Sequence, residues 1–180
     1  MVLHVVQNIP FASLRKKLLS FICDVCILLD IDLPAVKFVD DYDPSDNPEE
    51  AAVYYVVETN TLILRTACLT KENYGLIQFA IVRELCMAMQ YQQHLKEFGP
   101  EPVPDDPWLF WCEEAFADGF AVAVMDYLYG ADTWDHYGIL EIKESLWYDF
   151  AYFVELAANE LEKMISTDND YCFHPPPLLW

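Results

Sequence analysis

The first half of the chain combines one long helical pattern with several short strand patterns. Residues 11–29 carry an apolar residue at every third or fourth position with charged residues between them, which predicts an amphipathic helix. Residues 35–39 predict a strand, and the acidic, proline-containing run 40–50 predicts an exposed loop. Two runs rich in β-branched and aromatic residues, 52–57 and 61–66, lie three residues apart, which predicts a β-hairpin.

Helical patterns dominate the second half. A long stretch without proline, from 72 to about 96, predicts a helix that ends near Gly99. A second helix is expected at about 109–128, and it is apolar on nearly all sides, as is typical of a helix in the middle of a core. Residues 139–165 predict a third, amphipathic helix, whereas the proline-rich residues 166–180 predict an extended tail.

The order of these elements predicts the fold class. A helix is followed by a strand, a hairpin and then further helices, which indicates an α+β domain with a small sheet of about three strands packed on helices. No internal repeat and no linker interrupts the pattern. We therefore expect residues 1–165 to form a single domain, followed by a tail at 166–180.

Composition agrees with a folded domain. Hydrophobic residues make up 54% of the 180 residues, too many for a chain kept disordered by its charge. No stretch approaches the roughly 18 uninterrupted apolar residues that a membrane-spanning helix needs. A membrane protein or a membrane partner is therefore not expected.

The net charge of −20 is concentrated in the second half of the chain. Residues 97–180 hold 18 acidic residues and only two bases, Lys143 and Lys163, while residues 1–96 hold 12 acids and 8 bases. An acidic surface repels phosphate backbones, so direct nucleic-acid binding is not expected. A solvated acidic surface is the simplest interpretation, and a basic protein partner or mimicry of nucleic acid stays open.

Six cysteines are present, but we do not expect disulfides. The chain is long enough to bury a core without covalent links and does not open with a secretory signal, so a cytoplasmic protein with reduced thiols is expected. The pair Cys23 and Cys26 has the spacing of half a zinc or redox motif, but no second pair matches it. Two core cysteines are the better interpretation.

Two strings in the predicted helices carry the candidate chemistry. The first is Arg83-Glu84-Leu85-Cys86-Met87, and the second runs from Glu114 to Asp118 as E-A-F-A-D. The first resembles the H-E-x-x-H helix of zincin metallopeptidases, and the second resembles the E-x-x-A-D helix that supplies the third zinc ligand in gluzincin-type members. The order of elements agrees with this family, and the resemblance covers about two thirds of the chain, residues 11 to 128.

The resemblance implies a role for each matching position. In the family, two histidines four residues apart bind zinc, the glutamate between them is the general base, and a glutamate from the next helix completes the ligand set. Glu84 matches the general base, Glu114 the third ligand, and Asp118 the carboxylate that orients a ligand histidine. Arg83 and Met87 occupy the two histidine positions.

A catalytic zinc ion is not expected at these positions. A guanidinium has no lone pair to donate, and a thioether is too weak a ligand to hold zinc together with one carboxylate. No other metal, cofactor or catalytic residue is predicted. Our hypothesis is that Arg83 replaces the positive charge of the metal and pairs with Glu114, Asp118 or both, which would join the two helices.

Three functions follow from the sequence, in descending order of support. The first is a catalytically inactive metallopeptidase-like protein that binds a protein or peptide, either along a strand edge or through its acidic face. The second is an acidic mimic of nucleic acid that sequesters a basic DNA-binding protein. The third is an active hydrolase with an unorthodox site at Glu84 and Glu114, although no nucleophile or electrophile accompanies them.

Overall fold

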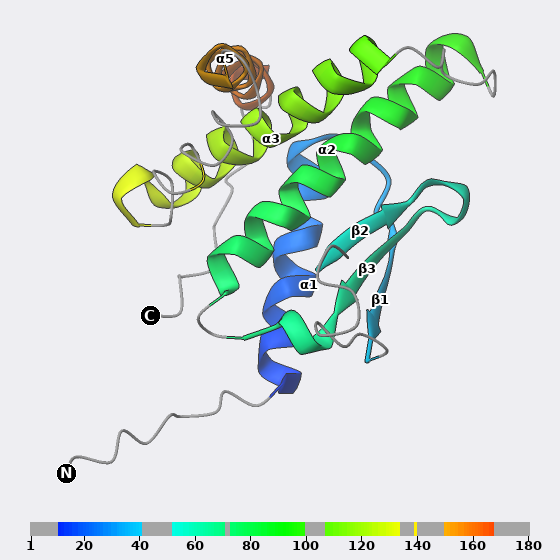
Figure 1. Cartoon of the computed structure of the whole chain (residues 1–180), viewed down its shortest axis with the longest axis vertical. Helices are drawn as coiled ribbons and strands as arrows, with labels where there is room; N and C mark the ends of the chain where they lie inside the picture. Colours follow the sequence, from blue (N-terminus) through cyan, green and yellow to red (C-terminus); the bar gives the residue numbers. More distant parts are fainter. Residues whose placement is uncertain are drawn as a thin grey trace.

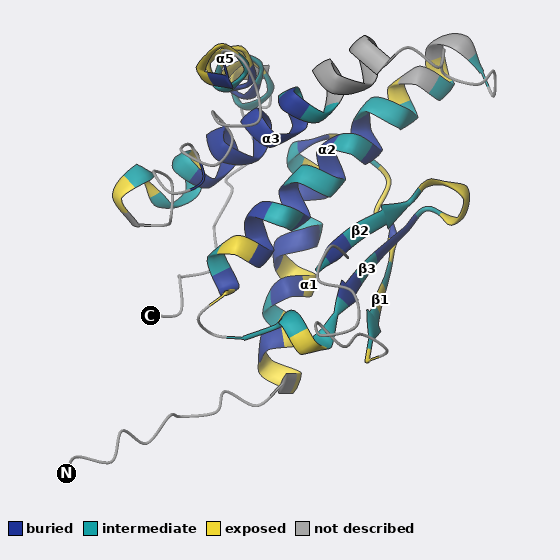
Figure 2. Cartoon of the chain, viewed as in Figure 1, coloured by how far each residue is buried: buried dark blue, intermediate teal, exposed yellow. Residues whose placement is uncertain are grey.

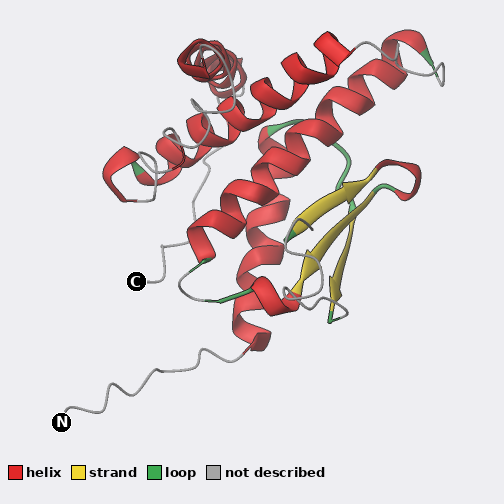
Figure 3. Cartoon of the chain, in the orientation of Figure 1, coloured by secondary structure: helices red, strands yellow, loops and turns green. Residues whose placement is uncertain are grey.

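The computed structural model describes residues 11–40, 52–70, 73–99, 107–133, 139 and 150–167. Within these ranges the protein has the expected α+β fold, with four α-helices and one small mixed sheet (Figures 1 and 3). The helices are α1 (Phe11–Leu28), α2 (Tyr74–Phe98), α3 (Pro107–Tyr129) and α5 (Phe150–Thr167). The strands are β1 (Ala35–Val39), β2 (Val53–Val56) and β3 (Thr61–Arg65), and short 3₁₀ turns are η1 (Val57–Thr59), η2 (Thr66–Cys68) and η3 (Ala131–Thr133).

The expected elements are confirmed to within about two residues, the usual uncertainty of element ends, wherever the chain is described. The last helix differs most from its prediction, because α5 continues to Thr167 and so includes two residues that we assigned to the tail. Residues 140–149 of the expected helix, most of the acidic loop at 40–50, and the tail from 168 onward lie outside the described residues.

The sheet has the strand order β1-β3-β2, so β3 is central (Figure 1). β2 and β3 form the predicted antiparallel hairpin, and β1 pairs with β3 in parallel. Asn60 turns the hairpin with a left-handed φ of 44°, a conformation that asparagine tolerates better than most residues. Its side-chain oxygen accepts a hydrogen bond of 2.8 Å from the Tyr55 hydroxyl, which fixes the turn against β2.

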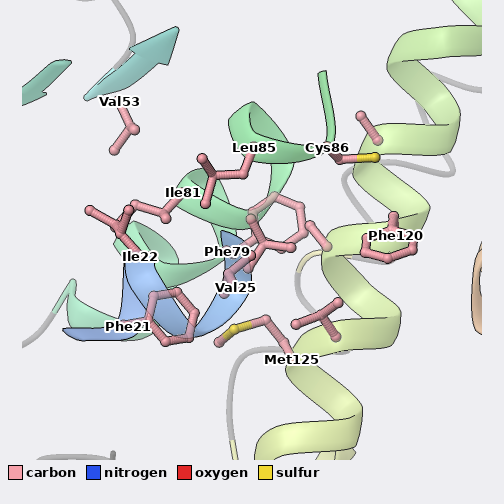
Figure 4. Packing of buried hydrophobic residues seen from close by; sticks show 14 of the residues in the cluster. Phe21, Ile22, Val25, Val53, Phe79, Ile81, Leu85, Cys86, Phe120 and Met125 are labelled. Atoms are coloured by element: carbon pink, nitrogen blue, oxygen red, sulfur yellow. The ribbon is translucent and has the colours of Figure 1, made fainter. Parts of the chain in front are cut away.

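The elements stack in the order sheet, α1 and α2, then α3, then α5 (Figure 1). Residues 117–125 of α3 are all buried, which confirms the prediction of a helix that is apolar on nearly all sides (Figure 2). One cluster of buried side chains includes residues from every helix and from β2 and β3. Figure 4 shows part of this cluster, including Phe21, Ile22, Val25, Val53, Ile81, Leu85, Phe120 and Met125. Phe150 and Ala157 of α5 also belong to the cluster. Within the described residues, no helix is long and apolar enough to cross a membrane.

Gly119 allows α5 to approach α3 closely. A Cβ atom at this position would lie 2.8 Å from the main-chain carbon and oxygen of Phe153 and 3.0 Å from the nitrogen of Val154. Because these are backbone atoms, a Gly119→Ala variant must push the two helices apart. We expect a loss of about 1–3 kcal/mol in the free energy of unfolding, measured by urea denaturation.

Gly75 provides the matched control, because it lies in the first turn of α2 and a Cβ atom there would meet no heavy atom within 4 Å. Gly75→Ala is expected to leave stability unchanged or to raise it by up to about 1 kcal/mol, since alanine favours helix more than glycine does. Equal destabilisation by both substitutions would contradict the close packing of α3 on α5.

Candidate functional site

Four charged side chains meet where α2 packs on α3. Arg83 and Glu84 come from the middle of α2, and Glu114 and Asp118 lie one turn apart on α3 and so share one side of that helix. The Arg83 Nη2 atom lies 3.0 Å from Oε1 of Glu114, and its Nε atom donates a hydrogen bond of 3.0 Å to Oδ1 of Asp118. Its Nη1 atom contacts Oε1 of Glu84. We call these four residues the Arg83 cluster.

The cluster also reaches the sheet. The main-chain N–H of Tyr55 donates a hydrogen bond of 2.9 Å to Oε2 of Glu84. β2 is an edge strand, so this N–H lies on the side that does not pair with β3. Glu84 therefore links the edge of the sheet to Arg83, and the cluster joins β2, α2 and α3.

Burial makes the charges of the cluster strongly dependent on one another. The side chain of Asp118 is 1% exposed, that of Glu84 is 12% exposed and that of Arg83 is 23% exposed. Burial alone lowers the pKa of Arg83, but the adjacent carboxylates Glu84, Asp118 and Glu114 outweigh it, so the pKa is raised. The guanidinium is therefore a permanent cation that faces three carboxylates.

The pKa of Glu84 is also raised, although its hydrogen-bond partners act to lower it. Burial raises its pKa above the ordinary 4.5, and this effect outweighs the lowering by Arg83 and by the Tyr55 N–H. The stability contribution has a definite sign, because a folded-state pKa above the unfolded value means that the folded state binds the proton more tightly. The Glu84 carboxyl consequently favours folding more at pH values near and below 4.5 than at neutral pH.

The donor set does not fit a zinc ion. Arg83 fills the first position that the resemblance assigns to a histidine, and its nitrogens are committed to carboxylates. Met87, at the second position, is partly buried and packs against the apolar core. In the described part of the chain, no group of three or more His, Cys, Asp and Glu side chains is placed to hold a metal ion.

The structure brings together most of the residues that the sequence singled out. The expected pairing of Arg83 is confirmed with both Glu114 and Asp118. Two contacts were not predicted. The first is the contact between Arg83 and Glu84, because adjacent residues of a helix do not normally face each other. The second is the hydrogen bond from Tyr55 to Glu84, because its donor is a main-chain group.

The cysteines of the described region are buried or partly buried thiols. Cys26 and Cys86 are buried, while Cys23 and Cys68 are partly exposed, and all four are free. Burial, with a smaller contribution from Cys23, raises the pKa of Cys26 to about 12. Burial also raises the pKa of Cys86, which lies close to Arg83 and Asp118. The prediction of two core cysteines is therefore confirmed for Cys26 but not for Cys23, which is partly exposed on α1.

Thiol labelling provides a test of this core. Since the thiolate is the reactive form, we expect iodoacetamide at pH 8 to modify Cys26 and Cys86 at least about tenfold more slowly than Cys68 in the native protein. In urea the rates should converge. Peptide mapping by mass spectrometry gives the rate at each cysteine, and native labelling of Cys86 as fast as that of Cys68 would show that the α2–α3 contact opens readily.

Comparison with protein-family models, with curated proteins and with solved structures finds no match to this chain. The zincin resemblance therefore depends on the motif residues, and their roles stay predictions. The observations that bear on function are the contacts of Arg83 with three carboxylates and the link from Glu84 to the edge of the sheet.

Proposed function

We propose that this chain is a catalytically inactive, zincin-like protein that acts by binding a protein or peptide partner. One observation carries the proposal. The three carboxylates at the general-base, third-ligand and orienting positions of the motif, Glu84, Glu114 and Asp118, all contact the side chain that replaces the first histidine. A cation is needed where these carboxylates meet, and Arg83 supplies it.

Arg83 supplies charge but none of the chemistry of a metal. A guanidinium offers no lone pair, no open coordination position and no means of lowering the pKa of a bound water. Glu84 is held by Arg83 and by the Tyr55 N–H, so its two oxygens are both engaged in structural contacts. This arrangement supports a structural role for the former catalytic positions.

The same contacts favour one mode of binding over another. A peptide added along the edge of β2 would need main-chain groups on the side where the Tyr55 N–H already bonds to Glu84. The acidic helices of the second half are not restricted in this way, because α3 contains no Lys or Arg and α5 contains only Lys163. A partner that docks on the helices through basic residues is therefore the form of binding that we favour.

The inactivity is tested with the purified, untagged protein. Elemental analysis should find no bound zinc, and neither added zinc nor a chelator should shift the melting temperature, since a ligand of the native state must raise it. Hydrolysis of a mixed fluorogenic peptide library should not exceed that of a Glu84→Gln variant. Stoichiometric zinc, a chelator-sensitive melting temperature and hydrolysis that disappears in Glu84→Gln would together overturn the proposal.

A further inference from the structure

A crevice lies between α3 and α5 on the acidic half of the molecule. The two helices are in close contact at Gly119 and Phe153. Further along both helices they leave a pocket of about 350 Å³. Its walls come from the C-terminal parts of both helices, and its lining residues are Ala123, Tyr127, Ala158, Leu161, Glu162, Ile165 and Ser166.

The floor of the crevice is apolar and includes one prominent aromatic side chain. Ala123 and Leu161 are buried within it, at 6% and 4% exposure. Tyr127 also lines the pocket, and its side chain is 50% exposed. Tyrosines that combine exposed area with an adjacent apolar pocket are typical anchors for protein partners.

One acidic residue, Glu162, lines the crevice beside this apolar floor. Glu162 is exposed, and Asp126 precedes Tyr127 on α3. The only base on either helix, Lys163, pairs with Glu160 on α5. The rim of the crevice is therefore negative, and it complements a basic ligand rather than an acidic one or a nucleic acid.

We propose that the α3–α5 crevice is the docking site for a basic amphipathic helix of a partner protein. This inference rests on the proposed function and specifies the site and the partner chemistry. The apolar face of the helix fills the crevice beside Tyr127, and its Lys and Arg residues lie against Glu162. A groove between two helices suits an amphipathic helix with anchors one turn apart, and strand addition has no sheet edge to use at this place in the fold.

The test uses a blocked synthetic helix of leucine and lysine, with the leucines on one face, titrated calorimetrically into the full chain at 150 mM salt. A peptide of the same composition in scrambled order controls for simple charge attraction. Two variants are compared. Tyr127→Ser removes the anchor in the crevice, and Tyr152→Ser removes a tyrosine of similar exposure, 56%, that does not line the pocket.

We expect the amphipathic helix to bind at least about tenfold more tightly than the scrambled peptide, and Tyr127→Ser to weaken it about tenfold or more. Tyr152→Ser should change the affinity less than about twofold. Equal binding of the two peptides, equal effects of the two substitutions, or no binding would each overturn this docking site. None of these outcomes bears on the zinc and hydrolysis measurements, so failure of the docking site is distinguishable from failure of the inactive-scaffold proposal.

Discussion

Replacement of Arg83 by methionine is expected to lower the free energy of unfolding by about 3–5 kcal/mol, the range found when one partner of a buried ion pair is removed. Methionine retains most of the length and packing of the arginine stem. The loss of stability therefore measures the effect of removing the charge. Without Arg83, Asp118 is left as an almost fully buried carboxylate, and Glu84 and Glu114 lie beside it without a cation. Urea denaturation at pH 7 measures the change.

Arg15→Met is the matched control for this substitution. Arg15 is an exposed residue of α1 whose guanidinium lies 4.3 Å from the centre of the Phe38 ring. Loss of this cation–π contact at an exposed site costs only about 0.5–1 kcal/mol. If Arg83→Met were no more destabilising than Arg15→Met, the Arg83 cluster would not hold α2 and α3 together.

The effect of Arg83→Met should also depend on pH in a defined direction. Arg83 lowers the pKa of Glu84, whereas burial raises it, so removal of Arg83 lets burial raise this pKa further. The folded variant then binds the Glu84 proton more tightly than the unfolded chain does, and its stability increases as the pH falls toward 4.5. The difference between wild type and Arg83→Met should therefore be largest near pH 7 and should shrink under mildly acidic conditions.

The double variant Arg83→His, Met87→His is expected to bind zinc, which we do not expect of the wild type. Positions 83 and 87 are four residues apart on α2 and therefore on one side of the helix, and Arg83 already contacts Glu114 from this side. Two imidazoles and one carboxylate then form a donor set typical of catalytic zinc sites. A dissociation constant of about 1 μM or tighter, equivalent to roughly 8 kcal/mol or more, is expected.

Much of the fold follows from local patterns in the sequence. The strand at Ala35–Val39 has the expected ends, and the hairpin at 53–65 forms as its β-branched runs predict. The helical patterns also place α2 and α3 correctly, because apolar spacing and proline boundaries act within each segment. Local patterns do not specify that β1 pairs in parallel with β3, since this pairing joins two strands that are separated along the chain by β2.

The candidate site was predictable where the zincin resemblance places charged residues together. The resemblance assigns Glu114 and Asp118 to positions that face residue 83, and a partly buried guanidinium needs such carboxylate partners. The Tyr55 N–H has no side-chain signature, because every residue except proline has the same donor. The crevice beside Tyr127 was also not predictable, since it depends on how closely α5 approaches Gly119.

The central claim is that Arg83 stands where a metal ion would otherwise be needed, and zinc titration of the Arg83→His, Met87→His variant tests it most directly. The variant should bind one zinc ion per chain, with affinity reduced at least about tenfold when Glu114→Gln is added, since a ligand is lost. Added Glu84→Gln should leave binding nearly unchanged, because the resemblance assigns Glu84 to the general base and not to the zinc ligands. A folded double variant that binds no zinc, or binds it equally well with Glu114→Gln, would contradict the claim.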